Sequence, residues 1–485
     1  MTHFRRHDGW TIVALLLAGF LLRMALLGSK SLWLDEANAL HVSSLGQAVL
    51  WAGRGEGYHP PFFYKILEYW RLLGEDEFTL RLLAVMPSTL TIPLLYQLGR
   101  KLLQREVATT ATALVSFSPL LVWYGQELRS YALLGFLGMV VMLSVTYLRA
   151  RFHPFCWLML ACSLVAAFYL HYFAVLLIPL AAMLLVVSLP TKQVTWQGVT
   201  SISGALIVAI IAYWPWLQSP AAQNFLNIAQ GDRNYLYQLL ITRLNFLPYV
   251  EQIYLLLIAS GLLGILFALV TSYYVVKNFT VNPRFLRLAR SRGTQVLLLL
   301  LYTVTLILIV WPRGYSVKRQ LVMFWPFVLL SLAWFWPWQK QQKSVIMLAL
   351  LGSVAACLVS IVLIPKPEWR EVNSYILANY QSSDAVLLEP TYMTIPFDYY
   401  NRNQTARKGI RFGNDGETLQ QLVQEHGRIW HIIHLTDKDA EQRNSRWLDA
   451  HMQLMNVKQF YRIQIQLYQH LQETNYGFGD YFDEH

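Results

Sequence analysis

The feature that most constrains the fold is a series of apolar runs along the chain, each about 18 to 22 residues long. A helix of that length is long enough to cross the hydrocarbon core of a bilayer. Charged residues make up only 14% of the 485 residues, whereas a soluble protein carries about 25%. The sequence therefore predicts a polytopic α-helical membrane protein.

Basic residues lie mainly in the short loops between these runs, and their distribution predicts the orientation. Arg5 and Arg6 precede the first run, so we expect the amino terminus in the cytoplasm and the chain in the plasma (inner) membrane. The run is longer than a signal core and no A-x-A cleavage site follows it, which favours an uncleaved helix. Eleven spans are expected, at about 10–28, 80–98, 106–123, 131–148, 155–170, 173–189, 198–216, 251–275, 295–311, 320–336 and 344–364.

Composition and motifs exclude several classes of function. The net charge of +11 comes largely from the basic loops and does not indicate nucleic-acid binding. Cys156, Cys162 and Cys357 all lie in apolar runs, so neither a disulfide framework nor a zinc cluster is expected. There is no Walker loop, G-x-G-x-x-G, H-E-x-x-H, C-x-x-C or G-x-S-x-G motif. A nucleotide cofactor is therefore not expected.

The composition changes at Pro365, after which Gln, Asn, Asp, His and Arg become frequent. Alternating helix and strand patterns are expected at 368–380, 384–388, 393–400, 428–434, 447–455 and 457–468. We therefore expect a membrane domain over residues 1–364, with a long first outer loop at 29–79. An α/β domain over residues 365–485 is expected on the extracytoplasmic side.

Two adjacent carboxylates, Asp35 and Glu36, lie in this first outer loop, within S-L-W-L-D-E-A-N-A at 31–39. Acids this close to the lipid usually have a function or a partner. Asp35 is a candidate general base for an attacking hydroxyl, and equally a candidate cap of a short helix. Glu36 could orient an acceptor, bind a metal or pair with Arg129.

Further polar groups are expected on the same side of the membrane and are candidates for binding a phosphate. Arg129 could bind a phosphate or simply pair with Glu127, and His59 could bind a phosphate or a metal or be structural. Candidate metal ligands are Asp35, Glu36 and His59. The remaining candidates are Pro60, Pro61, Tyr64, His171, Tyr172, Arg313, Lys318 and Arg319; for the last three, headgroup snorkelling is the alternative.

Four sequence motifs resemble a known family when they are taken in order. They are L-W-L-D-E-A, H-P-P-F-F-Y, E-F-T-L-R-L-L-A-V-M-P-S and S-P-L-L-V-W-Y-G-Q-E-L-R-S-Y-A-L-L. The chain resembles glycosyltransferase family 39, the polyprenyl-phosphate-mannose–protein mannosyltransferase-like group of the GT-C membrane enzymes, and is similar to lipid A aminoarabinose transferases. The resemblance covers about 29–135 and resumes at K-P-E-W-R-E-V.

The resemblance implies roles for individual residues. Asp35 would be the catalytic base or acceptor contact, with Glu36 as the neighbouring acid. His59, Pro60 and Pro61 match the H-P-P element. Glu127, Arg129 and Tyr131 match a Q-E-x-R-S-Y element near the donor or the acidic pair. Lys318-Arg319-Gln320 stands where an Arg-Tyr motif is often found in the family.

The expected function is therefore inverting transfer of a sugar from a polyprenyl-phosphate-linked donor to an acceptor hydroxyl on the outer side of the membrane, with Asp35 as the base. The acceptor is expected to be a lipid, a glycan or a protein. The sequence leaves the need for a divalent metal ion open. A secondary transporter of a polar or lipid-linked solute is the alternative, although no internal repeat is visible. A non-catalytic membrane-anchored binding or assembly protein is a third possibility.

Overall fold

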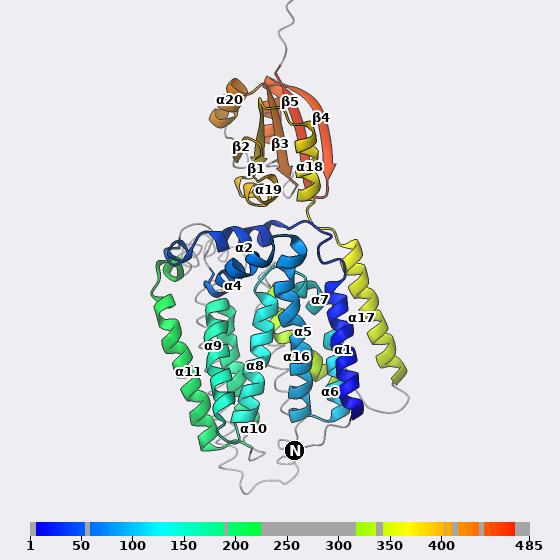
Figure 1. Ribbon diagram of the computed structural model, residues 1–485, viewed down its shortest axis with the longest axis vertical. Helices are drawn as coiled ribbons and strands as arrows, with labels where there is room; N and C mark the ends of the chain where they lie inside the picture. The colour runs from blue at the N-terminus through cyan, green and yellow to red at the C-terminus, as the bar shows by residue number, and fades with distance from the viewer. Residues whose placement is uncertain are drawn as a thin grey trace, which may run out of the picture. The chain divides into compact units, whose positions relative to one another are not determined.

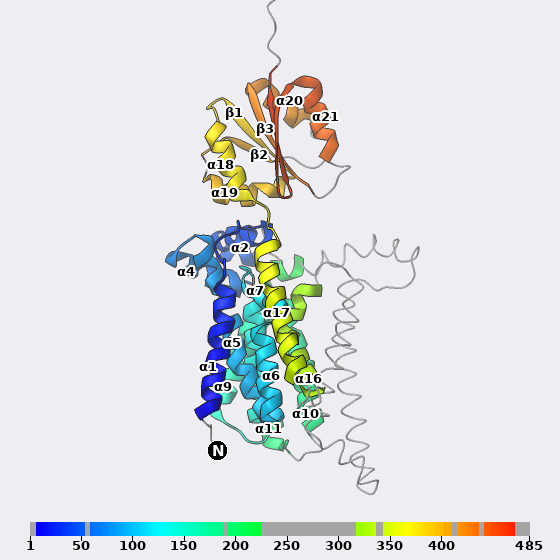
Figure 2. The same ribbon diagram turned by 90° about the vertical axis from the view of Figure 1, so that its right-hand side faces the viewer.

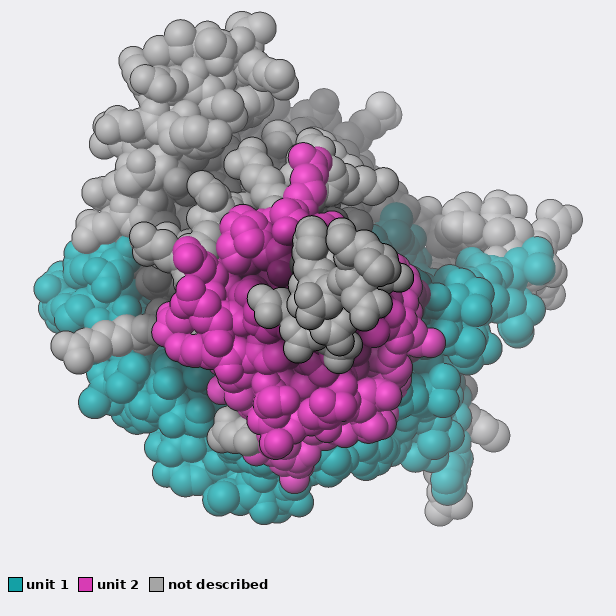
Figure 3. All heavy atoms as spheres, turned by 90° about the horizontal axis from the view of Figure 1, so that it is seen from above, with its two compact units in different colours: residues 1–29, 39–364 teal, residues 30–38, 365–485 magenta. Residues whose placement is uncertain are grey.

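The computed structural model describes residues 6–53, 59–188, 193–224, 317–335, 343–402, 404–409, 416–435 and 441–470. Its contacts divide the chain into two compact units (Figure 3). Unit 1 comprises residues 1–29 and 39–364. Unit 2 comprises residues 365–485 together with residues 30–38 of the first outer loop. The inclusion of this short segment in unit 2 differs from the expected division at residue 364.

Unit 1 is built from helices, and the long ones run side by side (Figure 1). The short helices of the first outer loop are α2 (Leu34–Ser44), which starts in unit 2, α3 (Gln47–Trp51) and α4 (Phe62–Trp70), followed by the 3₁₀ turn η1 (Arg71–Leu73). The remaining described helices of the unit are α1 (Arg6–Met24), α5 (Glu77–Leu102), α6 (Arg105–Ser116), α7 (Pro119–Gly125), α8 (Tyr131–Leu148), α9 (Pro154–Leu170), α10 (Leu177–Ser188), α11 (Trp196–Leu217), α16 (Val317–Phe335) and α17 (Lys343–Leu363).

The central helix of unit 1 is α5, which packs against α1, α6 and α8. It begins where the Asp76 carboxylate accepts a hydrogen bond from the backbone N–H of Thr79 at 3.0 Å, a typical N-cap. Its interior contains Pro87 and Pro93. Such prolines are tolerated in apolar helices when neighbouring helices and Ser or Thr side chains satisfy the backbone groups they free.

The expected span 106–123 is wrong as a single straight helix, because α6 and α7 meet at a bend of 51°. Pro119 supplies no amide hydrogen to continue α6, and the Ser118 side chain caps α7 instead. The carbonyls left at the end of α6 accept hydrogen bonds from the buried guanidinium of Arg23, at 3.0 Å for Ser116 and 3.3 Å for Val115. The charged side chain inside the first apolar run therefore stabilises the break.

Four of the described helices are long and apolar enough to cross a membrane, or five if the bent pair counts as one span. The expected spans at 251–275 and 295–311 lie outside the described residues, so the count of eleven stays a prediction. Over 173–189 the structure has a 3₁₀ turn, η2 (Tyr172–Leu176), before α10 begins. His171 starts this turn by accepting a hydrogen bond at its ring nitrogen.

Unit 2 contains a five-stranded sheet with strand order β2-β1-β3-β5-β4. Its strands are β1 (Asp384–Glu389), β2 (Arg407–Gly409), β3 (Arg428–His434), β4 (Gln453–Phe460) and β5 (Ile463–Gln469). β1 is parallel to β2 and β3, whereas β5 is antiparallel to both β3 and β4. Its helical elements are α18 (Trp369–Asn379), η6 (Thr391–Met393), α19 (Thr394–Asn401), α20 (Gly416–Glu425) and α21 (Glu441–His451).

Helices cover both faces of this sheet (Figure 2). α18 and α19 pack on one face over Trp430 and Ile432, whereas α20 and α21 pack on the other over Leu387 and Ile429. The expected helix at 447–455 is wrong at its end, because α21 stops at His451 and β4 begins at Gln453. β4 and β5 form a hairpin where the sequence predicted one final strand at 457–468.

Candidate functional site

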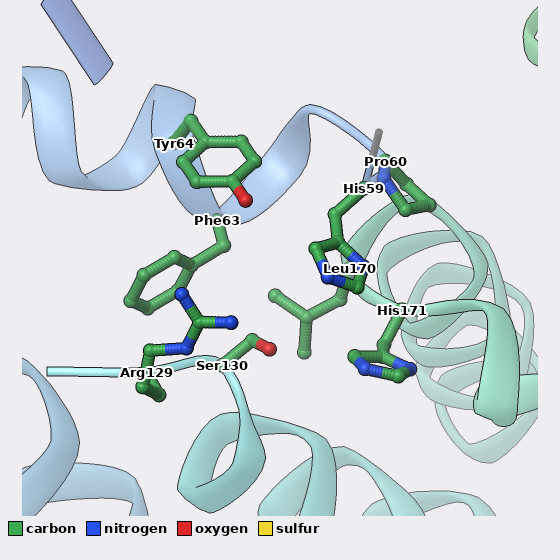
Figure 4. Close-up of a pocket in the computed structure, with 8 residues that line it drawn as sticks. All are labelled: His59, Pro60, Phe63, Tyr64, Arg129, Ser130, Leu170 and His171. Carbon is green, nitrogen blue, oxygen red and sulfur yellow. The ribbon is translucent and has the colours of Figure 1, made fainter. Parts of the chain in front are cut away.

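A pocket in unit 1 lies between the first outer loop, the start of α8 and the junction after α9 (Figure 4). Figure 4 shows Arg129 and Ser130 on one side of it and the rings of His59 and His171 on the other. The pocket is lined by His59, Pro60, Phe63, Tyr64, Arg129, Ser130, Leu170 and His171. Five of the candidate residues named from the sequence, drawn from three separate stretches, therefore share one pocket.

His59 presents an unsatisfied polar atom to this pocket. Its Nδ1 is buried and has no hydrogen-bond partner among the described residues. Its ring lies 5.2 Å from the ring of His171, centroid to centroid. Burial, and secondly the positive charge of Arg129, lower the pKa of His59 to about 4, so its imidazole is neutral at physiological pH. Unpaired buried polar atoms are rare and require an explanation.

His171 is held in one tautomer by the backbone. The N–H of Phe173 donates to its Nδ1 at 3.1 Å, so that nitrogen is an acceptor. In a neutral ring the proton then resides on Nε2, which becomes a donor. Burial is the main cause that places the pKa of His171 well below its usual value, with smaller contributions from His59 and Arg129.

Aromatic rings connect the pocket to a more distant cation. The Arg129 guanidinium lies 5.9 Å from the ring of Tyr131, which in turn lies 5.8 Å from the ring of Tyr124. A side-chain hydrogen bond joins Tyr124 to Arg319. The structure therefore connects Arg319 to the pocket through two tyrosines that follow one another closely in sequence. Tyr131 also contacts His171, with ring centroids 5.9 Å apart.

The other candidates are placed less directly. The ring of Tyr172 lies 6.4 Å from that of His59, and Pro61 occupies the position before α4, where it opens the helix. Glu127 is buried and accepts a hydrogen bond from the indole N–H of Trp123 at 2.8 Å. Lys318 lies in the first turn of α16, and Arg313 lies outside the described residues.

The acidic pair lies in the first turn of α2 and belongs to unit 2. Asp35 is therefore inside the helix, as its second residue, and the alternative prediction that it is the N-cap is wrong. The capping contact comes from Glu36, whose Oε2 accepts a hydrogen bond from the backbone N–H of Trp33 at 3.4 Å. Glu36 is fully buried and forms an ion pair with Lys366 at 3.2 Å. Asp35 is half-buried.

The described residues do not fit a metal site. Nowhere among them do three or more His, Cys, Asp or Glu side chains gather as metal ligands do. The candidate ligands Asp35, Glu36 and His59 form no such group among the residues that the structure describes. No step of the chemistry is therefore assigned to a metal ion.

Three comparisons place these observations among known proteins. A family model described as dolichyl-phosphate-mannose-protein mannosyltransferase matches residues 58–217, which include every residue of the pocket. No curated protein sequence matches the chain. Solved structures do match it over most of its length.

One of these is the Archaeoglobus fulgidus oligosaccharyltransferase in complex with Zn and sulfate, with 10% identity and a TM-score of 0.54 over 87% of this chain and 67% of that one. Another is ArnT from Cupriavidus metallidurans in the apo state, with 13% identity and a TM-score of 0.51 over 96% of this chain and 98% of that one. The chain has the fold of the GT-C membrane glycosyltransferases.

The ArnT structure bound to undecaprenyl phosphate is similar at 12% identity and a TM-score of 0.51, covering 95% of this chain and 98% of that one. The suspected resemblance to GT-C enzymes is therefore confirmed. Sequence reasoning did not single out Ser130, Phe63 and Leu170 in the pocket, nor Lys366 beside Glu36. The sequence could have identified Ser130, because this residue follows Arg129 in the Q-E-x-R-S-Y element.

Proposed function

We propose that this GT-C chain is an integral-membrane glycosyltransferase. It moves a sugar from a polyprenyl-phosphate-linked donor to an acceptor hydroxyl, on the extracytoplasmic side of the membrane and with inversion at the anomeric carbon. The family match over the pocket supports the class. The neighbour that binds undecaprenyl phosphate supports a lipid phosphate as the donor group. The acceptor is a lipid, glycan or protein hydroxyl.

The pocket in unit 1 carries the proposal for donor binding. It presents the cation of Arg129, the Nε2 donor of His171 and the buried Nδ1 of His59, which has no hydrogen-bond partner among the described residues. A phosphodiester oxygen accepts hydrogen bonds and carries negative charge, so it would accept from the guanidinium, from His171 Nε2 and from His59 in the tautomer that carries its proton on Nδ1. Arginine is well suited to this because its planar fork can contact two phosphate oxygens.

Asp35 is proposed as the general base. Its carboxylate accepts the proton of the acceptor hydroxyl as that oxygen attacks the anomeric carbon. The bond between the anomeric carbon and the phosphate oxygen breaks, and the lipid phosphate leaves with the bonding electron pair. Arg129 would stabilise the negative charge that develops on the leaving group. Arg319, which is connected to Arg129 through Tyr124 and Tyr131, would add to this stabilisation. No nucleotide is required, because the phosphate is itself the leaving group.

The test is release of free polyprenyl phosphate by the purified chain in nanodiscs. Wild type, Asp35→Asn and a control, Asp398→Asn, are incubated with polyprenyl-phosphate-linked mannose, glucose, galactose and arabinose. Asp398 is a suitable control because it lies in unit 2 and forms a partly exposed ion pair with Arg407. We expect release with one donor, retained in Asp398→Asn and lost in Asp35→Asn. Absence of both release and binding for every lipid would refute the class.

A further inference from the structure

Residues 30–38, here called the acidic segment, are bonded to the carboxyl-terminal part of unit 2 at several positions, although more than 300 residues of sequence separate the two. The Ser31 hydroxyl donates to the Glu371 carboxylate at 3.1 Å and accepts from the backbone N–H of Arg370, also at 3.1 Å. The backbone N–H of Leu32 donates to the hydroxyl of Tyr400 at 2.7 Å. These bonds fix the chain immediately before α2.

Apolar packing reinforces the attachment. Leu32 is fully buried. Leu34, the first residue of α2, packs against the core cluster of unit 2 that includes Trp369 and Phe397. The same cluster joins α18, α19 and one face of the sheet. The residue before Asp35 therefore packs against the hydrophobic core of the unit, and this packing helps to fix the position of Asp35.

Lys366 adds an ion pair to these contacts. Its ammonium contacts Glu36 Oε2 at 3.2 Å, the same oxygen that accepts the Trp33 N–H at the start of α2. The Lys366 side chain is 10% exposed and that of Glu36 is 0% exposed. A carboxylate in such surroundings is costly unless a cation compensates it. Lys366 thereby stabilises the capped first turn of the helix on which Asp35 lies.

We propose that Lys366 is a positioning residue for sugar transfer, acting through Glu36 to hold the first turn of α2 and so to orient the Asp35 carboxylate. This assignment rests on the proposed function, in which Asp35 is the base. It gives the carboxyl-terminal unit a part in catalysis that requires no contact between its sheet and the substrate. The two roles agree with the burial of the two carboxylates. Glu36, which contacts only protein groups in this role, is buried, whereas Asp35, the proposed base, is half-buried.

The experiment compares Lys366→Met with Lys366→Arg, which keeps the charge, and with Lys458→Met as control. Lys458 lies on the exposed strand β4 of the same unit. We expect Lys366→Met to lower kcat by about 10- to 100-fold, because small misplacements of a catalytic group have effects of this size. The KM for the donor should stay within about twofold, since positioning of the base leaves donor binding intact. Lys366→Arg should recover most of kcat, and Lys458→Met should behave as wild type.

A structural readout accompanies the kinetics. Amide hydrogen exchange over residues 31–38 should accelerate in Lys366→Met and stay at the wild-type rate in Lys458→Met. If Lys366→Met does not fold, the double variant Glu36→Gln/Lys366→Met, which buries no unpaired charge, replaces it. Its kcat should match that of Glu36→Gln alone, because Lys366 acts through Glu36.

The outcomes separate this inference from the function on which it rests. A wild-type kcat in Lys366→Met or in the double variant, with active wild type and inactive Asp35→Asn, overturns the positioning role and leaves the function standing. Equal losses in Lys366→Met and Lys366→Arg also overturn it, because the charge would then be irrelevant. A wild-type chain that neither binds nor turns over any donor overturns both proposals.

Discussion

The pocket of unit 1 and the acidic segment of unit 2 differ in how they hold the polar groups that the proposed reaction uses. In the pocket, His59 Nδ1 is buried without a partner among the described residues, and His171 uses one ring nitrogen to cap a turn. In the acidic segment, Ser31, Leu32 and Glu36 all have protein partners. An unmet hydrogen-bonding atom at a pocket suits a ligand site, whereas bonds from Ser31, Leu32 and Glu36 to the surrounding protein suit a group that must keep one orientation.

This difference predicts that donor binding and chemistry can be separated by mutation. Changes in the pocket should weaken the donor complex, whereas changes at the acidic segment should slow turnover without changing donor affinity. The donor used in each test is the lipid-linked sugar that supports turnover in the release assay.

The largest effect is expected at the acidic segment. Asp35→Asn should lower kcat by about 10²- to 10⁴-fold, the usual range for loss of a general base. Its donor Kd, measured by direct binding in nanodiscs, should equal that of wild type. A raised donor Kd with a smaller loss of kcat would contradict the division between binding and chemistry, because Asp35 would then contribute to donor binding.

The next effect is expected at the cation of the pocket. Arg129→Met should raise the donor Kd by about 10- to 100-fold, because hydrogen bonds to charged groups contribute about 1.5 to 3 kcal/mol. Arg129→Lys should recover only part of this, since lysine lacks the planar fork. Titration of a phosphate-free polyprenol supplies the control, and its affinity should be the same in all three proteins.

A smaller effect is expected at His59. His59→Leu removes a nitrogen that has no partner among the described residues, and it should raise the donor Kd by about 10-fold, the lower end of the range for a hydrogen bond to a charged group. Without ligand, the same variant should unfold at a temperature no lower than wild type, because it removes a buried polar atom that has no partner in the described part of the chain. Unchanged donor affinity together with lowered thermal stability would make His59 structural.

The smallest effect is expected from pH. Because burial and Arg129 lower the pKa of His59 to about 4, the ring binds no proton as pH falls from about 7.5 to about 5.5. A phosphodiester donor keeps its single charge over this range, so its Kd should vary by less than about twofold in the wild type. Binding that tightens about tenfold toward pH 5.5 would show that a histidine of the pocket gains charge there.

Much of the unit 1 pattern was predictable, because each helix is specified by a local apolar run. The helices at 131–148 and 155–170 were predicted nearly to the residue, as α8 and α9. The break between α6 and α7 was not predicted, although Pro119 marks it. A hydropathy profile reports the length of an apolar run and not a bend within it. At this bend the Ser116 carbonyl accepts a hydrogen bond from Arg23, which is 93 residues away in sequence.

Unit 2 was predicted less well where its strands lie at an edge. β1 and β3 are buried and apolar, and both were expected. The side chains of β4 are almost all exposed. Because neither face of the strand is buried, its sequence shows no alternation of apolar and polar residues that would predict a strand. β4 exists because β5 offers it a hydrogen-bonding partner, and that pairing is a tertiary contact.

By itself, the sequence determined the apolar spans, the polar carboxyl-terminal segment and the motifs that carry the GT-C resemblance, because each depends on residues close together in the chain. The tertiary structure decided which side chains meet. It placed His59, Arg129 and His171 around one pocket and assigned the segment bearing Asp35 to the unit that contains Lys366. Pairing of groups hundreds of residues apart depends on how the helices and strands pack, and a short sequence pattern does not predict it.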